Sequence, residues 1–502
     1  MIAAVGDWLG RRASYTPNKE ALVVEPEAGG PLRLTYGAWN ARANQTAHWL
    51  LAAGIERGDR VGVVAQNCVQ MLDLLFACGK IGAIFVPYNW RLTEAELWPL
   101  VADTEPKLLF TDKAELWQAA GAGVAGAPAT GALPRILPIG ALDPSDLPAV
   151  PPPPVELSLD DPWMILYTGG TTGRSKGAII SHGQATWNAW NTIAGWGLSP
   201  DERVPLLTPL FHTGGLNVFT TPLALLGGTT ILMGAFDPGS LLGVIERERV
   251  TVLFMVPTMY QMLQAHPWFG RANLSSVQWA ISGGAPCPRP VLDSFWARGI
   301  DLRQGYGLTE VGPNCFAIPA EAVRSMPGSV GFPIMHGAVR VMEGDRPCGP
   351  GEVGELQLRG PHVTVGYWRR PDATAEANPD GWFRTGDLVY RDEAGFFFIV
   401  DRKKEMFISG GENIYPVEVE SAIYEHPAVA EAAVVGVPDP QWGEVGKAFV
   451  VLKPGVLLTS EELLRFLRER LARYKVPKFI EFRAALPRSA AGKILKRELK
   501  TS

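Results

Sequence analysis

Residues 35–110 alternate between helix and strand signals, and this alternation limits the possible folds of the 502-residue chain more than any other feature. An alanine-rich segment that ends at Gly54 is typical of a helix, and the short apolar segments after it are typical of buried strands. Thr93 and Glu96 have the spacing of a capping box, which predicts another helix start. The expected elements are a strand at 61–65, a helix at 69–78, and strands at 83–86 and 108–111. This strand–helix–strand rhythm predicts an α/β fold with parallel strands.

The chain becomes rich in strand signals after residue 340, and its last hundred residues have a separate pattern. We expect a helix at 417–424, strands at 432–437 and 448–452, and an amphipathic helix in which Leu463, Leu467 and Leu471 follow a capping box at 459–462. A chain of this length exceeds one ordinary core. The prediction is a large N-terminal multi-layer α/β domain with a β-rich portion, residues 1–401, and a small α+β domain, residues 402–502.

Residues 114–160, rich in Ala, Gly and Pro, are interpreted as a surface connection. Residues 204–236 contain no Asp, Glu, Lys or Arg, which would also be typical of a membrane span. Several prolines and paired glycines in this segment would weaken a lipid-exposed helix, so no transmembrane segment is expected and a buried substrate channel is the preferred interpretation.

Charge and cysteine content exclude some classes of protein. The formal net charge is −5 and no long basic run is present, so nucleic-acid binding is not expected. Five widely spaced cysteines without a Cys-x-x-Cys pair fit a reducing compartment, and residues 1–10 lack the pattern of a secretory signal. A cytoplasmic location is the expectation.

The segment from Tyr167 to Gly177 (YTGGTTGRSKG) concentrates glycines, hydroxyls and two cations in eleven residues. Glycines let backbone N–H groups approach phosphate oxygens, while Arg174 and Lys176 supply positive charge. The spacing differs from that of the P-loop of strand-and-helix NTPases. It favours a polyphosphate-binding loop of another kind, although loops of this composition are often ordinary surface turns.

Six further motifs follow in order: PLFHTGG (209–215), SGGAP (282–286), QGYGLTE (304–310), TGD (385–387), DRKKEMFISGGENIYPVEVE (401–420) and PRSAAGK (487–493). Together with the glycine-rich loop they span almost the whole chain. The sequence therefore resembles the acyl-adenylate-forming (ANL) superfamily, which includes acyl-CoA synthetases, luciferases and the adenylation domains of peptide synthetases. The resemblance implies ATP, Mg²⁺ and coenzyme A as cofactors and co-substrates, and a C-terminal domain that rotates between two half-reactions.

The resemblance assigns phosphate binding to the glycine-rich loop and catalysis to residues that stabilise negative charge. Glu310 and Thr168 are the expected Mg²⁺ ligands, and Thr309 is expected to reach the α-phosphate. Lys493 would contact the substrate carboxylate and the α-phosphate during adenylation; without the motif around it, a solvated lysine would be the simpler interpretation. The expected phosphate-binding residues are Thr168, Gly169, Gly170, Thr171, Thr172, Gly173, Arg174, Ser175 and Lys176.

The resemblance also implies the nucleotide site. Tyr306 would offer a flat face to adenine, and Asp387 would accept both ribose hydroxyls with Arg402 as a nearby donor. An ordinary buried tyrosine and common turn residues are the alternatives. The remaining residues expected around the nucleotide are Gly283, Gly284, Ala285, Gln304, Gly305 and Gly307.

Lys404 matches the hinge position of the family, between the large and small domains. Rotation about it would remove Lys493 after adenylation and present Gly410, Gly411 and Glu412, whose glycines would let a pantetheine arm pass close to the backbone. A plain Gly-Gly turn is the alternative.

His212 would either gate the acyl pocket or be a packed core histidine. Peptide-synthetase adenylation domains typically have Asp at this position, which holds the amino group of an amino acid, so an amino-acid substrate is not expected. Asp237 is interpreted as a structural turn residue. An acyl pocket near Trp187, Trp190, His212, Thr213, Gly214, Gly215 and Gly331 would suit an apolar chain or an aromatic ring, although simple helix packing is the preferred interpretation of the two tryptophans.

The sequence thus predicts an AMP-forming acyl-CoA ligase that converts a carboxylic acid, ATP and CoA to a thioester, AMP and pyrophosphate. A medium- or long-chain fatty acid is the first expectation and an aryl or arylpropenoic acid the second. An enzyme that loads a carrier protein, a non-catalytic nucleotide-binding relative and a luciferase-like oxidase are the rival classes. A homodimer is an expectation drawn only from relatives.

Overall fold

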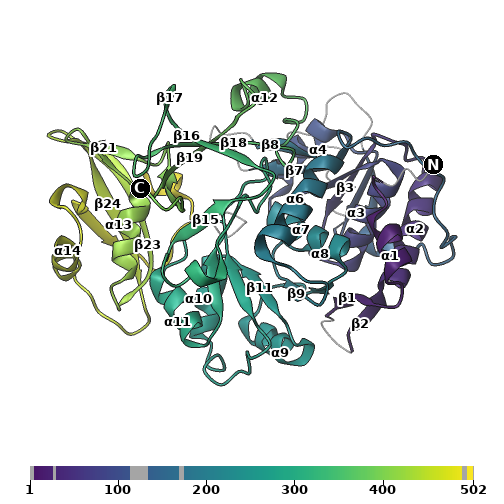
Figure 1. The fold of residues 1–502 in the computed structure, drawn as a ribbon, viewed down its shortest axis with the longest axis horizontal. Helices are drawn as coiled ribbons and strands as arrows, with labels where there is room; N and C mark the ends of the chain where they lie inside the picture. The colour runs from purple at the N-terminus through teal and green to yellow at the C-terminus, as the bar shows by residue number, and fades with distance from the viewer. Residues whose placement is uncertain (1–4, 26–29, 114–133, 169–174, 489–493, 501–502) are drawn as a thin grey trace.

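The computed structural model describes residues 5–25, 30–113, 134–168, 175–488 and 494–500. It contains a large N-terminal part and a smaller C-terminal part, which lies at the left of Figure 1. Each part has sheets and a core of its own. The expected mixed α/β fold with a large and a small domain is confirmed, and the boundary at residues 401–402 stays a prediction.

A six-stranded sheet with the order β6-β5-β3-β4-β7-β8 forms the first layer of the N-terminal domain. Neighbouring strands from β6 to β7 are parallel, whereas β7 and β8 form an antiparallel hairpin. The strands predicted from the βαβ rhythm are therefore confirmed. Their bounds are β3 (Arg60–Val64), β4 (Ile84–Pro87), β5 (Leu108–Thr111), β6 (Arg135–Pro138), β7 (Pro162–Thr168) and β8 (Lys176–Ser181).

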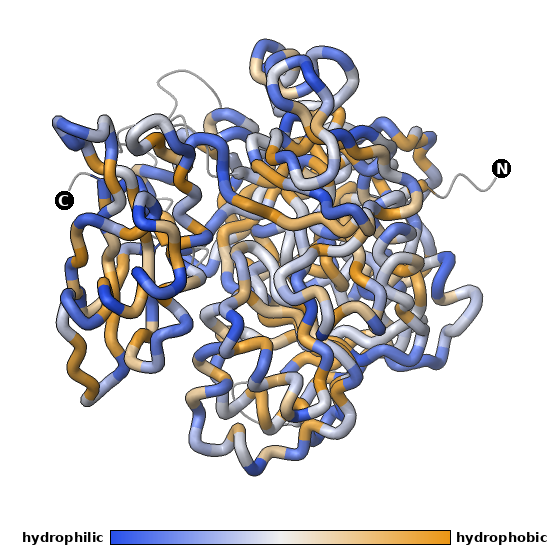
Figure 2. Tube along the Cα trace, turned by 60° about the vertical axis from the view of Figure 1, so that its left-hand side comes forward, coloured by the Kyte–Doolittle hydropathy of each residue, from blue (hydrophilic) through white to orange (hydrophobic). Residues whose placement is uncertain are grey.

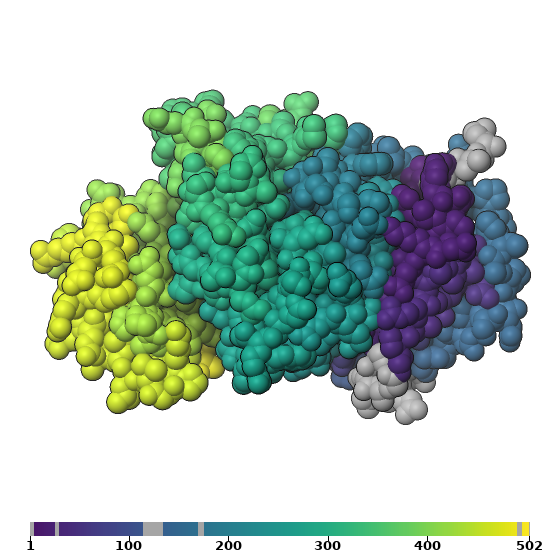
Figure 3. Space-filling model, turned by 60° about the horizontal axis from the view of Figure 1, so that its bottom comes forward, coloured from purple at the N-terminus to yellow at the C-terminus, as the bar shows by residue number. Residues whose placement is uncertain are grey.

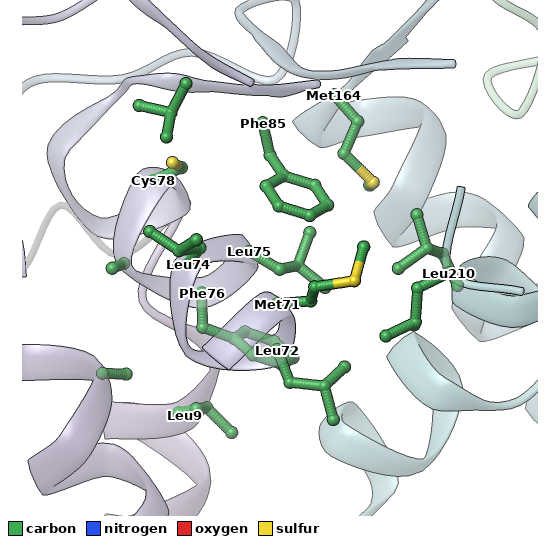
Figure 4. Packing of buried hydrophobic residues seen from close by; sticks show 14 of the residues in the cluster. Leu9, Met71, Leu72, Leu74, Leu75, Phe76, Cys78, Phe85, Met164 and Leu210 are labelled. Carbon is green, nitrogen blue, oxygen red and sulfur yellow. The ribbon is translucent and has the colours of Figure 1, made fainter. Parts of the chain in front are cut away.

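Helices cover this sheet and bury its apolar side chains. In α3 every residue from Met71 to Ile81 is buried, and Figure 4 shows some of these side chains, such as Leu75, beside Phe85 of a neighbouring strand. The predicted capping box is present at α4, because the Thr93 amide donates to the Glu96 carboxylate at 2.9 Å. The helices of this layer are α1 (Trp8–Tyr15), α2 (Tyr36–Ala52), α3 (Val69–Ile81), α4 (Glu94–Thr104) and α6 (His182–Trp196).

Two further sheets follow, with the orders β2-β1-β10-β9 and β11-β12-β13. Because β11, β12 and β13 are parallel and in register, Ser282 and Gln304 end neighbouring strands at the same edge. The motifs that begin at these two residues are thereby brought side by side. The strands are β1 (Glu20–Val24), β2 (Leu32–Thr35), β9 (Arg203–Leu206), β10 (Thr229–Leu232), β11 (Val252–Met255), β12 (Trp279–Ser282) and β13 (Asp301–Gln304). The helices are α7 (Thr213–Asn217), α8 (Thr220–Leu226), α9 (Pro238–Glu248), α10 (Pro257–Ala265) and α11 (Arg289–Ala297).

The uncharged segment at 204–236 folds as short strands and helices of this layer. The expectation that it is not a membrane span is confirmed. Among the described residues, no helix is long and apolar enough to cross a membrane.

The β-rich portion is a seven-stranded sheet in the order β14-β15-β20-β19-β18-β16-β17, with every pair antiparallel. It connects the parallel sheets to the C-terminal domain (Figure 1). Its elements are β14 (Phe316–Ala317), β15 (Ser329–Pro333), β16 (Ala338–Glu343), β17 (Arg346–Pro347), β18 (Gly354–Arg359), α12 (Pro371–Ala377), β19 (Phe383–Arg391) and β20 (Phe397–Arg402).

The C-terminal domain has the strand order β22-β21-β24-β23, with β25 parallel to β24. Figures 2 and 3 show it as a separate lobe at the left, and in Figure 3 it borders the middle of the chain. The Thr459 capping box is confirmed, but α14 ends at Arg468, so the prediction that Leu471 belongs to this helix is wrong. Leu471 still packs against the same core after the chain has turned. The elements are β21 (Phe407–Ser409), β22 (Glu412–Ile414), α13 (Pro416–Tyr424), β23 (Val429–Asp439), β24 (Gly443–Leu452), α14 (Ser460–Arg468), β25 (Phe479–Phe482) and α15 (Lys496–Lys500).

The described part of the connection at 114–160 is more ordered than the sequence predicts. Residues 135–138 form the edge strand β6, because their backbone groups pair with β5 and Ile136 is buried. The chain then follows α2, where the Asn44 side-chain amide donates to the Ala149 carbonyl at 2.7 Å. Residues 114–133 lie outside the described residues.

A cavity of about 670 Å³ at the N-terminal ends of β9 and β11 is lined by several arginines. Two of them are held by carboxylates: Arg33 and Arg203 both donate to Glu248, at 2.6 and 2.8 Å, and both pair with Glu20. Burial would raise the pKa of Glu248, but the hydrogen bonds and charges of Arg33 and Arg203 outweigh it and lower that pKa. This network joins β1, β2 and β9 to the end of α9.

Replacing Glu248 by alanine should lower the thermal midpoint of the N-terminal domain by about 3 °C, because it leaves two partly buried guanidinium groups without this partner. The lowered pKa means that the stabilisation is present above the ordinary pKa of glutamate and is lost as the pH falls through the folded-state value. Differential scanning calorimetry from pH 4 to 8 checks both effects. Glu352→Ala, at an exposed carboxylate of a hairpin, is the control.

Candidate active site

The glycine-rich loop connects the two strands of the β7–β8 hairpin. Thr168 ends β7 and lies opposite Lys176, which begins β8; the Thr168 hydroxyl donates to the Lys176 carbonyl at 3.4 Å. Ser175 is partly buried next to Lys176. The central residues of the expected phosphate site, Gly169, Gly170, Thr171, Thr172, Gly173 and Arg174, lie outside the described residues.

Thr309 and Glu310 occupy a turn just after β13, and three neighbours fix it. The Gln184 side-chain amide donates to the Thr309 carbonyl at 3.0 Å, and the Thr364 amide donates to the Glu310 carbonyl at 2.6 Å. The Tyr367 hydroxyl donates to Oε1 of Glu310 at 3.0 Å. The turn thus presents one carboxylate on a fixed backbone.

The described residues contain no group of three or more His, Cys, Asp or Glu side chains that could hold a metal ion. Magnesium in phosphate-transferring sites is commonly held by one or two carboxylates together with substrate phosphates. Glu310 fits this mode, because Oε2 has no hydrogen-bond partner among the described residues. A bound Mg²⁺ would neutralise charge on ATP phosphates beside Glu310, and Thr168 remains a predicted ligand.

Asp387 lies at the centre of a small ionic cluster between β19 and β20. Its Oδ1 accepts from Nε of Arg402 at 2.7 Å, and its Oδ2 accepts from the Tyr306 hydroxyl at 2.6 Å. Burial, together with the neighbouring Asp387 carboxylate, raises the pKa of Tyr306 well above its usual value, so this hydroxyl stays a donor. A carboxylate has two acceptor oxygens, which is the chemistry that a pair of ribose hydroxyls would need.

Gln304 holds the SGGAP segment beside this cluster. Its side-chain amide donates to the Ala285 carbonyl at 3.2 Å, while its oxygen accepts from the Cys287 amide at 2.9 Å. Gly307 is required for close packing, since a Cβ there would lie 2.3 Å from the Gly312 carbonyl oxygen. The other expected nucleotide residues, Gly283, Gly284 and Gly305, lie in the same two segments.

His212 precedes the short helix α7 and is half-buried, with its ring 5.8 Å from that of Phe211. Its role as a gate stays a prediction. Phe254 lies between two motifs, because a Cβ on Gly214 or Gly283 would approach its ring to 3.4 or 3.2 Å. Asp237 accepts from the Ser240 amide at 2.7 Å and caps α9, which confirms its structural interpretation.

The two tryptophans of α6 differ. Trp187 contacts His336 edge-on at 5.0 Å, which agrees with packing. Trp190 is 50% exposed, so its packing is only partial, and its interpretation stays a prediction.

The C-terminal domain carries the remaining predicted residues. Lys404 lies in the turn after β20 as an exposed residue, and partial desolvation of its ammonium group and the nearby Arg402 charge lower its pKa. Gly410 and Gly411 turn the chain between β21 and β22 with φ of 59° and 90°, and Glu412 begins β22. Lys493 lies outside the described residues.

The structure therefore brings Glu310 close to the hairpin of Lys176 through Tyr367, and Tyr306 close to Asp387 and Arg402. It also reveals supporting residues that the sequence does not mark, namely Gln184, Thr364 and Tyr367. Their signals are weak: only the sequence Gly366-Tyr367-Trp368, a glycine followed by two aromatic residues, could have drawn attention. Trp442 is another supporting residue that the sequence does not mark, because a Cβ on Gly410 would lie 2.8 Å from the Trp442 ring.

Stacked α/β sheets, a glycine-rich hairpin beside a fixed carboxylate and a small C-terminal domain agree with the class that the sequence motifs predict, the nucleotide-dependent enzymes that activate acids. Comparisons with known proteins agree with this class. The chain matches the model of the AMP-binding enzyme family over residues 9–368 and that of the AMP-binding enzyme C-terminal domain over residues 418–493.

Two relatives and one solved structure illustrate the similarity. A feruloyl-CoA synthase of Amycolatopsis sp. is 44% identical over 99% of this chain and 98% of its own length. An indoleacetate–CoA ligase of Aromatoleum aromaticum is 39% identical over 99% and 97%. The structure of o-succinylbenzoate coenzyme A synthetase from Bacillus subtilis with ATP and magnesium is 30% identical, covers 98% of this chain and 99% of its own, and has a TM-score of 0.87.

The chain belongs to the AMP-binding enzyme family, within the ANL superfamily. It is an ATP-dependent acyl-CoA ligase of the AMP-forming, acid–thiol type, which uses ATP, Mg²⁺ and CoA. The resemblance found in the sequence motifs is thereby confirmed.

Proposed function

We propose that the acyl substrate is an aryl acid, in first place an arylpropenoic acid. The acid and ATP would give acyl-AMP and pyrophosphate, and CoA would then give the thioester and AMP. The observation that carries this proposal is the 44% identity, over almost the full length, to an enzyme named for ferulate, together with 39% identity to one named for indoleacetate. These relatives favour the second expectation from the sequence over a fatty acid.

The residues beside Gly214 and Gly215 support an uncharged group behind the carboxylate of the substrate. A narrow cavity beside Gly214 and Gly215 is lined by apolar side chains and threonine hydroxyls, with no charged side chain. Phe219 and Phe254 contribute aromatic surface, with their rings 6.4 Å apart. Aromatic rings pack favourably edge to face, so this aromatic surface is compatible with an aryl substrate.

The polar residues would divide the work of the reaction. The β7–β8 hairpin would hold the triphosphate, Asp387 and Arg402 the ribose, and Gln304 the segment beside the base. Lys493 would place positive charge between the acid and the α-phosphate, where negative charge develops. The turn with Gly410 and Gly411 would then admit the thiol arm.

A substrate screen tests this proposal. We expect ATP-dependent pyrophosphate release with ferulate, cinnamate or indoleacetate, and CoA-dependent thioester formation, with kcat/KM at least about 10-fold above that for C8–C16 fatty acids. Preference for fatty acids would restore the first expectation. Pyrophosphate release that never depends on CoA would indicate a carrier-loading enzyme instead.

A further inference from the structure

Tyr367 connects two parts of the site that the sequence motifs leave separate. It lies on the segment 364–368, between β18 and α12, far along the chain from both the phosphate hairpin and Glu310. Its hydroxyl donates to the Glu310 carboxylate at 3.0 Å, and its ring lies 5.2 Å from the Lys176 ammonium nitrogen. One side chain therefore contacts the expected metal carboxylate and a cation of the phosphate loop.

The backbone of the same segment is fixed to both parts. Tyr367 bridges to Ala178 of β8, and the Trp368 amide donates to the Gly177 carbonyl at 2.8 Å. Thr364 donates its hydroxyl to the Ile179 carbonyl at 2.6 Å and its amide to the Glu310 carbonyl at 2.6 Å. The backbone around Tyr367 is therefore held both by β8 and by the turn that carries Glu310.

The chemistry of the contact suits a metal-binding carboxylate. A tyrosine hydroxyl is a neutral donor, so it orients Glu310 without cancelling its negative charge, as an arginine partner would. Among the described residues it is the one hydrogen-bond partner of this carboxylate, and it occupies Oε1 only. An ordinary tyrosine hydroxyl is protonated near neutral pH, so it can donate this hydrogen bond.

We infer that Tyr367 is a positioning residue: it orients Glu310 for a divalent cation bound with a triphosphate and holds Lys176 beside it. The inference rests on the proposed role of Glu310 in the ligase reaction. Tyr367 itself touches neither reacting atom.

Two substitutions separate the hydroxyl from the ring. Tyr367→Phe removes the hydrogen bond and keeps the ring beside Lys176, whereas Tyr367→Leu removes both. In Tyr367→Phe the Mg²⁺ concentration for half-maximal pyrophosphate release should rise about 10-fold, with kcat at saturating Mg²⁺ within about 2-fold, because a hydrogen bond to a charged group is lost. Tyr367→Leu should in addition raise KM for ATP.

A binding measurement keeps this test independent of the acyl substrate. Electron paramagnetic resonance of Mn²⁺, titrated into enzyme with a non-hydrolysable ATP analogue, should show about 10-fold weaker Mn²⁺ binding in Tyr367→Phe. In a Glu310→Gln background the same substitution should have little further effect. If the wild-type enzyme bound Mn²⁺ in this way but activated no aryl acid, the proposed function would fail while the inference stood.

Tyr36→Phe is the matched control. Its buried hydroxyl donates to the Leu223 and Gly228 carbonyls, away from the site, so its loss should affect stability and leave the Mg²⁺ dependence unchanged. A Tyr367→Phe enzyme with wild-type metal dependence, or one that only loses kcat or thermal stability at every Mg²⁺ concentration, would overturn the inference.

Discussion

Replacing Glu310 by glutamine should slow acyl-AMP formation about 10²- to 10³-fold at millimolar Mg²⁺. The amide has the size of the carboxylate and can still accept the Tyr367 hydrogen bond, so the turn should keep its structure. It lacks the charge that holds a divalent cation, and neutralisation of phosphate charge contributes several kcal/mol to such reactions. Burst-phase measurement of pyrophosphate release with the preferred acid gives this rate directly.

Glu352→Gln controls for the chemical change itself. This carboxylate lies in an exposed hairpin, paired with Arg346, and its substitution should leave the rate unchanged. A Glu310→Gln enzyme that retained a third or more of the wild-type rate would remove Glu310 from the metal site. Raising Mg²⁺ should recover part of the lost rate if the defect is in metal binding.

Much of the fold could be predicted from the sequence because its signals are local. The capping boxes at Thr93 and Thr459 depend on residues three positions apart, and both are present. The apolar segments of β3, β4 and β5 are short and bounded by turn residues, so their strands could be placed within two residues. Helix α3 extends three residues beyond its prediction, to Ile81, before Gly82 takes a left-handed conformation that ends it.

The incorrect predictions concern elements whose formation depends on contacts between residues far apart in the sequence. Strand β6 has little strand signal of its own and forms because β5 offers an unpaired edge. Leu471 fits a helical stripe, yet α14 ends before it. Neither outcome can be derived from a window of neighbouring residues.

The candidate site likewise has parts that the sequence predicts and parts that it does not. Its motifs could be recognised as short sequences, whereas the residues that hold them could not. Tyr367 and Glu310 are 57 positions apart, and Gln184 and Thr309 are 125 apart. These contacts form where α6 meets the turn after β13 and where the segment 364–368 pairs with β8, and no local pattern encodes either arrangement.

Gly411→Leu should slow thioester formation from acyl-AMP about 10²-fold while ATP–pyrophosphate exchange stays within a few-fold of the wild type. Gly411 lies in an exposed turn with φ of 90°, and a Cβ there would meet no atom within 4 Å. A larger side chain therefore has room in this structure and would act on a thiol arm that passes the turn, where misplacement by about 1 Å can cost 10²-fold. Rapid-quench assays of the two half-reactions separate the effects.

Gly411→Ala separates bulk from backbone strain. Any side chain at this φ is strained, so both variants should lose similar thermal stability, by the equivalent of about 1 kcal/mol. Alanine adds only a methyl group, so its thioester rate should fall much less than that of the leucine variant. Equal losses in the two variants would assign the defect to the strained turn, and an unaffected leucine variant would place the path of CoA away from Gly411. Gly410 cannot serve in this comparison, because a Cβ at that position would collide with the Trp442 ring at 2.8 Å.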